Sequence, residues 1–295
     1  MATTRITHPL RRALAAAVVT VALVLVFVLN PAAVKVYAAN MIGTLRAPGE
    51  PAFIAGHRGD RAEAPENTVP AFEAALAAGL DFVETDVQLT SDGRAVLIHD
   101  ETVDRTTNGT GAVADLNLEQ VRALDAGSWF DGSFTGTQVP LFSEYLDLFV
   151  GSQQKALIEL KGFWTVEQIR SILPDVYSRG VQNRVVFSSF DFTTIQNLGT
   201  VAPAIPRVII KRDLTGDPVA LADFYGAIAI MTTPLSLELN PFAVKAMHDA
   251  GFGVLLYTLN SEKRWGEALA YGVDGIVTDE PSELDGWIAR TAPGT

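Results

Sequence analysis

Two histidines and three carboxylates recur at one kind of position in this sequence, the end of a short apolar run. The four motifs are His57-Arg58-Gly59, Glu84-Thr85-Asp86, His99-Asp100 and Glu159-Leu160-Lys161. A histidine has a pKa near neutrality and can serve as a general acid or a general base. Each motif alone could be structural, but their repetition at the ends of apolar runs favours one shared chemical site.

The three carboxylates predict a binding site for a divalent cation. Glu84 and Asp86 are two residues apart, so in a strand their side chains point to the same face. Together with Glu159 they would repel one another unless a cation relieved the repulsion. Three acidic oxygen ligands favour Ca²⁺ or Mg²⁺ over Zn²⁺.

The basic residues of the same motifs complete a set that suits phosphoryl chemistry. Arg58 and Lys161, with the cation, can neutralise a phosphodiester and the charge that grows on it during reaction. His57 and His99 can divide the acid and base roles. The chain has no cysteine, no Gly-rich phosphate loop and no Gly-x-Ser-x-Gly motif, so we expect no covalent enzyme intermediate.

The pattern around these motifs predicts a TIM barrel, an α/β fold in which eight parallel strands alternate with helices. Runs rich in Val, Ile and Phe alternate with amphipathic stretches, as is typical of βα units. The expected strands are 52–56, 81–89, 95–98, 156–160, 184–188, 207–210, 227–231, 253–258 and 275–278, and the expected helices are 69–78, 166–178, 192–198, 241–250 and 262–271. The four motifs then lie at C-terminal strand ends, where barrel enzymes carry their active sites.

The ninth strand has a local explanation. Only Ser91-Asp92-Gly93-Arg94 separates the second run from the third, and so short a connection makes a β-hairpin rather than a crossover. The second strand therefore extends beyond the barrel and folds back, and we expect His99 to lie opposite Glu84. Residues 101–140 do not follow the βα pattern and predict a small insertion over one end of the barrel.

The N-terminal residues 1–40 predict a signal peptide or a membrane anchor. Arginines at positions 5, 11 and 12 precede an apolar run over residues 13–29, and Val36-Tyr37-Ala38 fits a cleavage site. The run also reaches the lower limit for a membrane span, so an uncleaved anchor that holds the enzyme at the membrane is an open alternative. In both cases the arginines stay inside and the remainder faces outward, which predicts an extracytoplasmic protein, secreted or anchored.

Composition limits the remaining domain and its partners. Residues 41–51 carry Gly43, Pro48 and Gly49 and predict a linker before a barrel domain over residues 52–290. Hydrophobic residues make up 48% of the chain, which is enough for a large core. The formal net charge is −12, and no cluster of Lys and Arg is present, so we expect no nucleic-acid partner.

The motifs resemble those of the glycerophosphodiester phosphodiesterase family. The resemblance covers about residues 51–290 and adds Pro65-Glu66-Asn67-Thr68, Val87-Gln88 and Asp92-Gly93 to the motifs above. It implies a barrel related to phosphatidylinositol-specific phospholipase C that hydrolyses glycerophosphodiesters to glycerol 3-phosphate and an alcohol. It further implies that Glu84, Asp86 and Glu159 bind the cation. His57 and His99 would then be the acid–base pair, while Arg58 and Lys161 hold the phosphate.

Three departures from the family pattern bear on substrate choice more than on catalysis. Tyr257-Thr258-Leu259-Asn260 stands where the family usually has Trp-Thr-Val-Asn, Thr278-Asp279-Glu280-Pro281 has an acidic residue where others are common, and Pro140-Leu141-Phe142 replaces Pro-Thr-Leu. One alternative is therefore a phospholipase C- or D-like enzyme acting on lysophospholipid or phosphatidylinositol. A second alternative, from another class, is a non-catalytic phosphodiester-binding protein.

Overall fold

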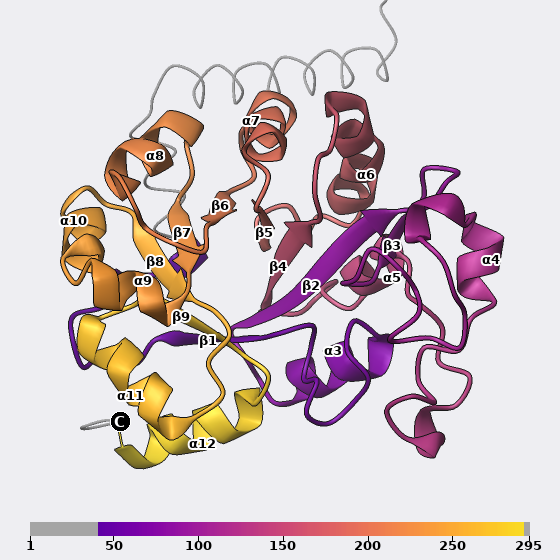
Figure 1. Cartoon of the computed structure of the whole chain (residues 1–295), viewed down its shortest axis with the longest axis horizontal. Helices are drawn as coiled ribbons and strands as arrows, with labels where there is room; N and C mark the ends of the chain where they lie inside the picture. Colours follow the sequence, from indigo (N-terminus) through magenta and orange to yellow (C-terminus); the bar gives the residue numbers. More distant parts are fainter. Residues whose placement is uncertain (1–40, 292–295) are drawn as a thin grey trace, which may run out of the picture.

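Eight parallel strands close into a barrel in the computed structural model, which describes residues 41–291 (Figure 1). Around the barrel they are β1 (Phe53–Gly56), β2 (Phe82–Leu89), β4 (Lys155–Leu160), β5 (Val185–Ser189), β6 (Arg207–Ile210), β7 (Ala229–Thr232), β8 (Gly253–Leu256) and β9 (Gly275–Thr278). Strand β1 pairs with both β2 and β9, and this double pairing closes the ring. The expected TIM barrel is confirmed.

Helices cover the outside of the barrel. They are α3 (Val69–Ala77), α5 (Phe142–Asp147), α6 (Val166–Ser178), α7 (Phe192–Val201), α8 (Pro218–Tyr225), α9 (Pro234–Leu239), α10 (Ala243–Asp249), α11 (Glu262–Tyr271) and α12 (Pro281–Thr291). The five expected helices are all present: α6 and α11 have the expected bounds, and the ends of the other three shift by at most three residues. Helices α5, α8, α9 and α12 were not expected. Pro218 and Pro234 occupy the first turns of α8 and α9, where a missing N–H costs little.

Alternation along each strand separates two hydrophobic cores. In β4, Leu157 points into the barrel and packs in a cluster with Val208 and Leu255, whereas Ile158 packs outward under the helices. Both faces of the sheet are thus buried, as parallel barrels require. The same alternation makes position 159 the next inward one, at the C-terminal end of the strand.

Strand β2 continues into a hairpin, as expected, but the register differs by one residue. Strand β3 (Ala95–Leu97) runs antiparallel to β2 with Val87 opposite Leu97. Extending this register places His99 opposite Thr85, so the prediction that it lies opposite Glu84 was wrong. The turn is centred on Asp92, half a residue beyond the centre that pairing of His99 with Glu84 would require, and Thr90 N–H accordingly donates to Arg94 O at 3.0 Å.

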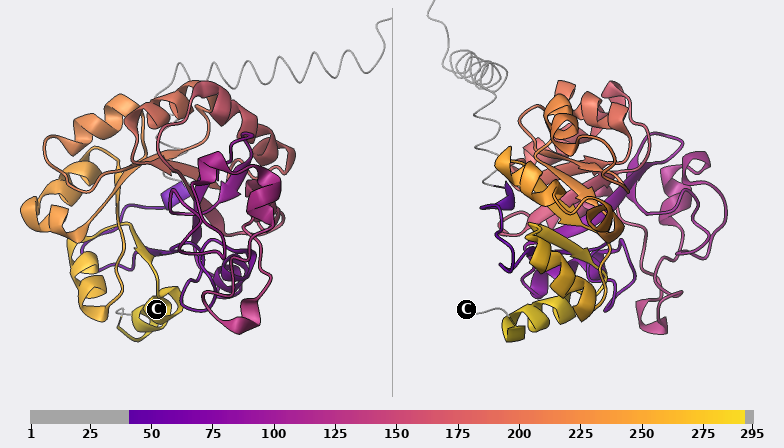
Figure 2. Two further views of the ribbon diagram at one scale, coloured as in Figure 1. Left: turned by 45° about the vertical axis from the view of Figure 1, so that its right-hand side comes forward. Right: turned by 60° about the vertical axis from the view of Figure 1, so that its left-hand side comes forward.

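Residues 101–140 form an insertion with a small core of its own. It contains α4 (Leu118–Arg122) and the 3₁₀ turns η1 (Val113–Asp115) and η2 (Gly132–Phe134). Val103, Val113 and Val121 are buried against Val96 and Ile98 of the hairpin. The insertion thus extends the C-terminal side of the barrel from the hairpin outward, as Figure 2 (right) shows.

Residues 41–51, expected to be a linker, instead pack against the barrel. Met41 and Ile42 are buried in the inner cluster, and Arg46 N–H donates to Asp274 Oδ1 at 2.9 Å. The N-terminal end of the barrel exposes apolar inward side chains, and this segment covers them. It lies on the opposite face from the insertion (Figure 2, right).

The predicted signal peptide or anchor, residues 1–40, lies outside the described residues. Between residues 41 and 291, no helix combines the length and the apolar character needed to cross a membrane.

Candidate active site

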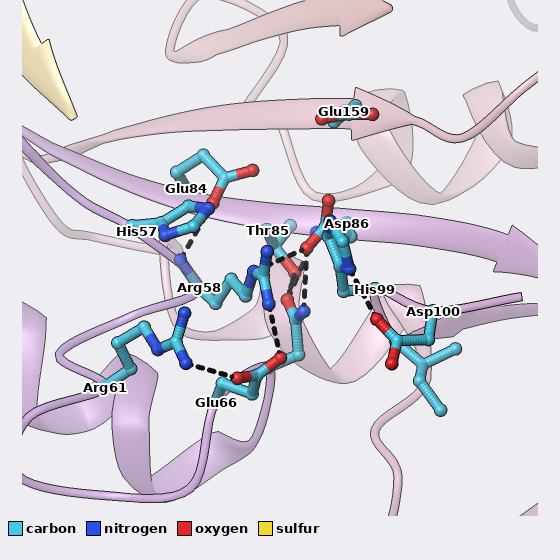
Figure 3. A network of polar contacts seen from close by, with 12 residues as sticks. His57, Arg58, Arg61, Glu66, Glu84, Thr85, Asp86, His99, Asp100 and Glu159 are labelled. Atoms are coloured by element: carbon cyan, nitrogen blue, oxygen red, sulfur yellow. Dashed lines mark hydrogen bonds and ion pairs between the residues drawn. The ribbon is translucent and has the colours of Figure 1, made fainter. Parts of the chain in front are cut away.

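Three buried carboxylates meet at the C-terminal end of the barrel. They project from two neighbouring strands, as Figure 3 shows. Glu84 and Asp86 lie on β2 and Glu159 on β4, where Asp86 and Glu159 are paired in register. One oxygen from each side chain lies within 4.8 Å of the other two. The structure therefore brings together the three residues that the sequence predicted as metal ligands.

The electrostatics of this cluster favour a bound cation. Burial, followed by repulsion from Asp86 and Glu159, raises the pKa of Glu84 well above its usual range. Burial and repulsion from Asp86 likewise raise the pKa of Glu159 to about 7. Burial also opposes ionisation of Asp86, but the charges of Lys161 and Arg58 outweigh it and lower the pKa of that carboxyl. Three crowded hard oxygen donors fit Ca²⁺ or Mg²⁺.

The two predicted phosphate-binding residues border the carboxylates. Lys161 Nζ lies 2.9 Å from Glu159 Oε1 and 3.4 Å from Asp86 Oδ1. Arg58 Nε lies 3.3 Å from Asp86 Oδ2, and this nitrogen is buried without a hydrogen-bond partner. It therefore keeps a donor for an incoming oxygen. Arg58 also has a φ of 58°, a conformation that a non-glycine residue adopts at a cost, as often happens at functional sites.

Each predicted acid–base histidine is held by a carboxylate through Nδ1. His57 follows β1, and its Nδ1 lies 2.6 Å from Asp279 Oδ1 at the end of β9. His99 Nδ1 lies 2.7 Å from Asp100 Oδ1. Burial is the main cause that lowers the pKa of both rings below the usual histidine value. Because Nδ1 is engaged in both rings, Nε2 is the nitrogen that can face a reactant.

Two supporting residues, Glu66 and Asn67, lie in the motif Pro65-Glu66-Asn67-Thr68, but their types and spacing alone did not indicate a role. The buried Glu66 carboxylate contacts Arg58 Nη1 at 2.6 Å, Arg61 Nη2 at 2.8 Å and Arg105 Nη2 at 2.8 Å. It thereby holds two guanidinium groups of the loop between β1 and α3 and one of the insertion, and Figure 3 shows the contacts with Arg58 and Arg61.

Asn67 orients one of the predicted metal ligands. Its Nδ2 donates to Asp86 Oδ2 at 2.9 Å, and its Oδ1 accepts from Asp86 N at 3.1 Å and from Thr85 Oγ1 at 2.8 Å. Hydrogen bonds of this kind fix the orientation of a metal-binding carboxylate. The tetrapeptide Pro65-Glu66-Asn67-Thr68 was the only signal for it in the sequence.

Comparisons with known proteins agree with this fold and show its family. The model of the glycerophosphoryl diester phosphodiesterase family matches residues 57–283. A glycerophosphodiester phosphodiesterase of Caldanaerobacter subterraneus is 33% identical over 236 residues, which is 79% of this chain and 96% of that protein.

Solved structures extend the likeness to three dimensions. A glycerophosphodiester phosphodiesterase from Agrobacterium tumefaciens is 32% identical with a TM-score of 0.70, covering 80% of this chain and 100% of that one. A phosphodiesterase from Oleispira antarctica, solved with the product sn-glycerol-3-phosphate, is 25% identical with a TM-score of 0.76, covering 81% and 97%. Barrel and site together define an enzyme of the phosphodiesterase class. The chain belongs to the glycerophosphoryl diester phosphodiesterase family, which confirms the resemblance seen in the sequence.

Proposed function

We propose that this enzyme hydrolyses glycerophosphodiesters to glycerol 3-phosphate and an alcohol, with Ca²⁺ or Mg²⁺ bound by Glu84, Asp86 and Glu159. The observation that carries the proposal is the meeting of three buried carboxylates, whose oxygens lie within 4.8 Å of one another, with two carboxylate-held histidines. The names of the relatives support the substrate class, and the product bound in the Oleispira structure supports glycerol 3-phosphate as a product.

The reaction follows from what the side chains can donate and accept. Arg58 and Lys161 bind the phosphate of the substrate and balance its charge. One histidine takes the proton of the glycerol hydroxyl next to the phosphate, and that oxygen attacks phosphorus. The other histidine protonates the departing alcohol, which leaves a cyclic phosphate. Water then opens the ring, with the two histidines exchanging roles.

Two further arguments support this order of steps. The attacking hydroxyl is tethered to the phosphate, and tethering lowers the entropic cost of attack. The cation, when bound, supplies Lewis-acid stabilisation of the charge that develops on the phosphate oxygens.

The metal requirement is tested by the glycerol 3-phosphate that the purified full chain releases from glycerophosphoinositol. We expect a chelator to abolish release, and excess Ca²⁺ or Mg²⁺ to restore it. Full activity in the chelator would overturn the assignment of the three carboxylates as metal ligands.

The internal attack is tested with an analogue that lacks the hydroxyl next to the phosphate but keeps the diester and the alcohol. We expect no measurable cleavage of this analogue, because the nucleophile is missing. If it is cleaved as fast as the parent substrate, water attacks directly and the cyclic intermediate is wrong.

We also propose that the catalytic domain works outside the cytoplasm. The arginines before the apolar run 13–29 support export, either with cleavage after residue 38 or with retention as an anchor. The extracytoplasmic location is tested with a reporter enzyme that is active only outside the cytoplasm. The reporter is fused after residue 45. We expect activity from this fusion and none from a control that starts at residue 41. An inactive fusion made in normal amounts would contradict the proposal.

A further inference from the structure

A second group of side chains lies across the barrel from the histidines. Strand β6 is four strands from β1 in either direction around the ring, so the residues after these two strands face each other across the C-terminal end (Figure 1). By the inward alternation of Val208 and Ile210, Arg212 is the next inward residue after β6. Ser188 and Phe190 take the inward positions at the end of β5 in the same way. Tyr257, after β8, packs against the inner cluster.

Three of these side chains form a corner with one free charge. The rings of Phe190 and Tyr257 meet edge to face with centroids 6.0 Å apart. The guanidinium carbon of Arg212 lies 5.9 Å from the centroid of Phe190. Among residues 41–291, no carboxylate lies within ion-pair distance of Arg212, whereas Arg58, Arg61 and Arg105 are all paired. The positive charge of Arg212 is therefore available to a ligand.

Two buried hydroxyl groups beside this corner make no hydrogen bond of normal geometry. Ser188 is fully buried, its Oγ has no hydrogen-bond partner, and the residue is paired in register with Glu159. The hydroxyl of Tyr257 is hidden from solvent, and its polar neighbour is Arg212, although the two make no hydrogen bond of normal geometry. Buried polar groups are rarely left unpaired in native proteins, so these two mark a place where a bound molecule supplies the missing partner.

Electrostatic effects on Tyr257 connect the corner to the reaction centre. Burial is the main cause that raises the pKa of the Tyr257 hydroxyl, with a further rise from Glu159 and opposing effects from Arg212 and Lys161. The hydroxyl thus lies in the field of the predicted metal ligand and of both cations. Ser188, paired in register with Glu159, places this corner beside the strand that carries the predicted metal ligand.

The charge of Arg212 determines which substituent suits the corner. Two aromatic rings could hold a quaternary ammonium through cation–π contacts, as many choline-binding sites do. Here, the face of Phe190 already carries a guanidinium, which repels a second cation. The same guanidinium attracts an anion and can donate hydrogen bonds to hydroxyl groups.

We propose that Phe190, Arg212 and Tyr257 form the subsite for the alcohol of the substrate, called the head group here, and that Arg212 selects anionic, hydroxyl-rich head groups over choline. The inference rests on the proposed hydrolysis of glycerophosphodiesters and adds the class of head group. Ser188 and the Tyr257 hydroxyl supply further hydrogen bonds to the hydroxyl groups of such an alcohol.

The test compares kcat/KM of the full chain for three diesters that share the glycerol phosphate and differ only in the head group. They are glycerophosphoinositol 4-phosphate, glycerophosphoinositol and glycerophosphocholine. We expect activity to fall in that order. In Arg212→Gln, the ratio of kcat/KM for the first substrate to that for the last should fall about tenfold, because a charge attraction and a charge repulsion are both removed. Arg212→Lys should retain most of the ratio.

The matched control is Lys211→Gln. Lys211 is the adjacent cation, but its Nζ is paired with Asp213 Oδ1 at 2.6 Å, and its substitution should leave the ratio unchanged. If Arg212→Gln lowers kcat/KM for all three diesters by one factor, Arg212 contacts the shared glycerol phosphate and the inference is wrong. A preference of the parent enzyme for glycerophosphocholine would also overturn it. If none of the three is hydrolysed, the proposed function itself fails, and this inference with it.

Discussion

At the scale of single residues, Glu159 is a carboxylate whose ionised form is destabilised by its surroundings. Burial and the neighbouring Asp86 disfavour its ionised form, although Lys161 Nζ lies only 2.9 Å away. A group held in this way contributes little to folding as a free anion and much to binding a cation. Its substitution should therefore separate metal binding from stability.

We expect Glu159→Gln to lower kcat/KM by about 100-fold or more and to weaken Ca²⁺ or Mg²⁺ binding, because one oxygen ligand loses its charge. The thermal midpoint of the metal-free variant should equal or exceed that of the metal-free parent, since repulsion is relieved. Calorimetric titration and thermal unfolding measure the two effects, with the exposed Glu167→Gln as control. Unchanged cation affinity would show that Glu159 is not a ligand.

Asp279 determines which nitrogen of His57 carries the proton. Its Oδ1 contacts His57 Nδ1 at 2.6 Å, while its Oδ2 accepts from Asn260 Nδ2 at 2.7 Å. In Asp279→Asn the new amide must keep its oxygen toward Asn260, so its NH₂ group turns toward His57. The ring then accepts at Nδ1 and carries its proton on Nε2, which is the wrong tautomer for a base.

We therefore expect Asp279→Asn to lower kcat by about 100-fold with little change in KM. Nitrogen NMR of the histidine ring should show the proton moved from Nδ1 to Nε2. Glu280→Gln makes the same chemical change one residue away and should leave both readouts as in the parent. A parent-like tautomer in Asp279→Asn would rule out this role.

The same carboxylate predicts an acid-sensitive part of the stability. Although burial opposes ionisation, the hydrogen bond and charge of His57 lower the pKa of Asp279 to about 2. The pKa of an aspartate in the unfolded chain is about 4, so the folded-state pKa of Asp279 is the lower of the two. The stabilisation from ionised Asp279 is therefore present above pH 4 and is lost as the pH falls toward 2. The difference in unfolding free energy between parent and Asp279→Asn should shrink over that interval. A difference independent of pH would contradict the assignment.

At the scale of elements, the hairpin and the insertion act as one unit that reaches back to the site. Arg105 of the insertion contacts Glu66 through Nη2 at 2.8 Å and Asp100 through Nε at 2.7 Å. Asp100 in turn holds His99. Arg105 of the insertion therefore reaches one of the two proposed acid–base residues through Asp100.

We expect Arg105→Gln to lower kcat about tenfold while the barrel stays folded, because Asp100 is freed and His99 loses its fixed direction. The side chain of Arg105 is 42% exposed, so the loss of stability should be small. Kinetics and circular dichroism measure the two quantities, and Arg94→Gln in the hairpin turn serves as control. Equal kcat values for the two variants would show that the insertion does not position His99.

Sequence patterns predicted the elements better than the contacts between them. The strands followed from apolar runs, and the hairpin followed from the short turn with Asp92-Gly93. Asp279 and His57 are 222 residues apart in the sequence. Local hydrophobic periodicity carries no information about a contact over such a distance. Helix α9 has only six residues between Pro234 and Leu239, too few for a helical period to stand out.

At the scale of the whole molecule, the barrel has one end for chemistry and another that residues 41–51 close. Gly43, Pro48 and Gly49 predicted a linker, because Gly and Pro indicate turns in the backbone. They give no information on whether the segment packs against the barrel. Ile42 packs so closely on the start of β8 that a Cβ at Gly253 would lie 2.5 Å from its Cδ1. The segment is thus part of the folded unit although it precedes the first strand.

We expect a chain that starts at residue 52 to unfold roughly 10 °C below one that starts at residue 41. Two fully buried side chains, Met41 and Ile42, contribute about 1.5–3 kcal/mol each, and their loss also exposes the inner cluster. The double substitution Met41→Ala/Ile42→Ala in the full chain should reproduce most of the shift. In all three proteins kcat should stay near the parent value below the unfolding transition, because the site lies at the opposite end of the barrel. Thermal unfolding followed by circular dichroism measures the shift, and equal midpoints for the two truncations would mean that the segment is a linker after all.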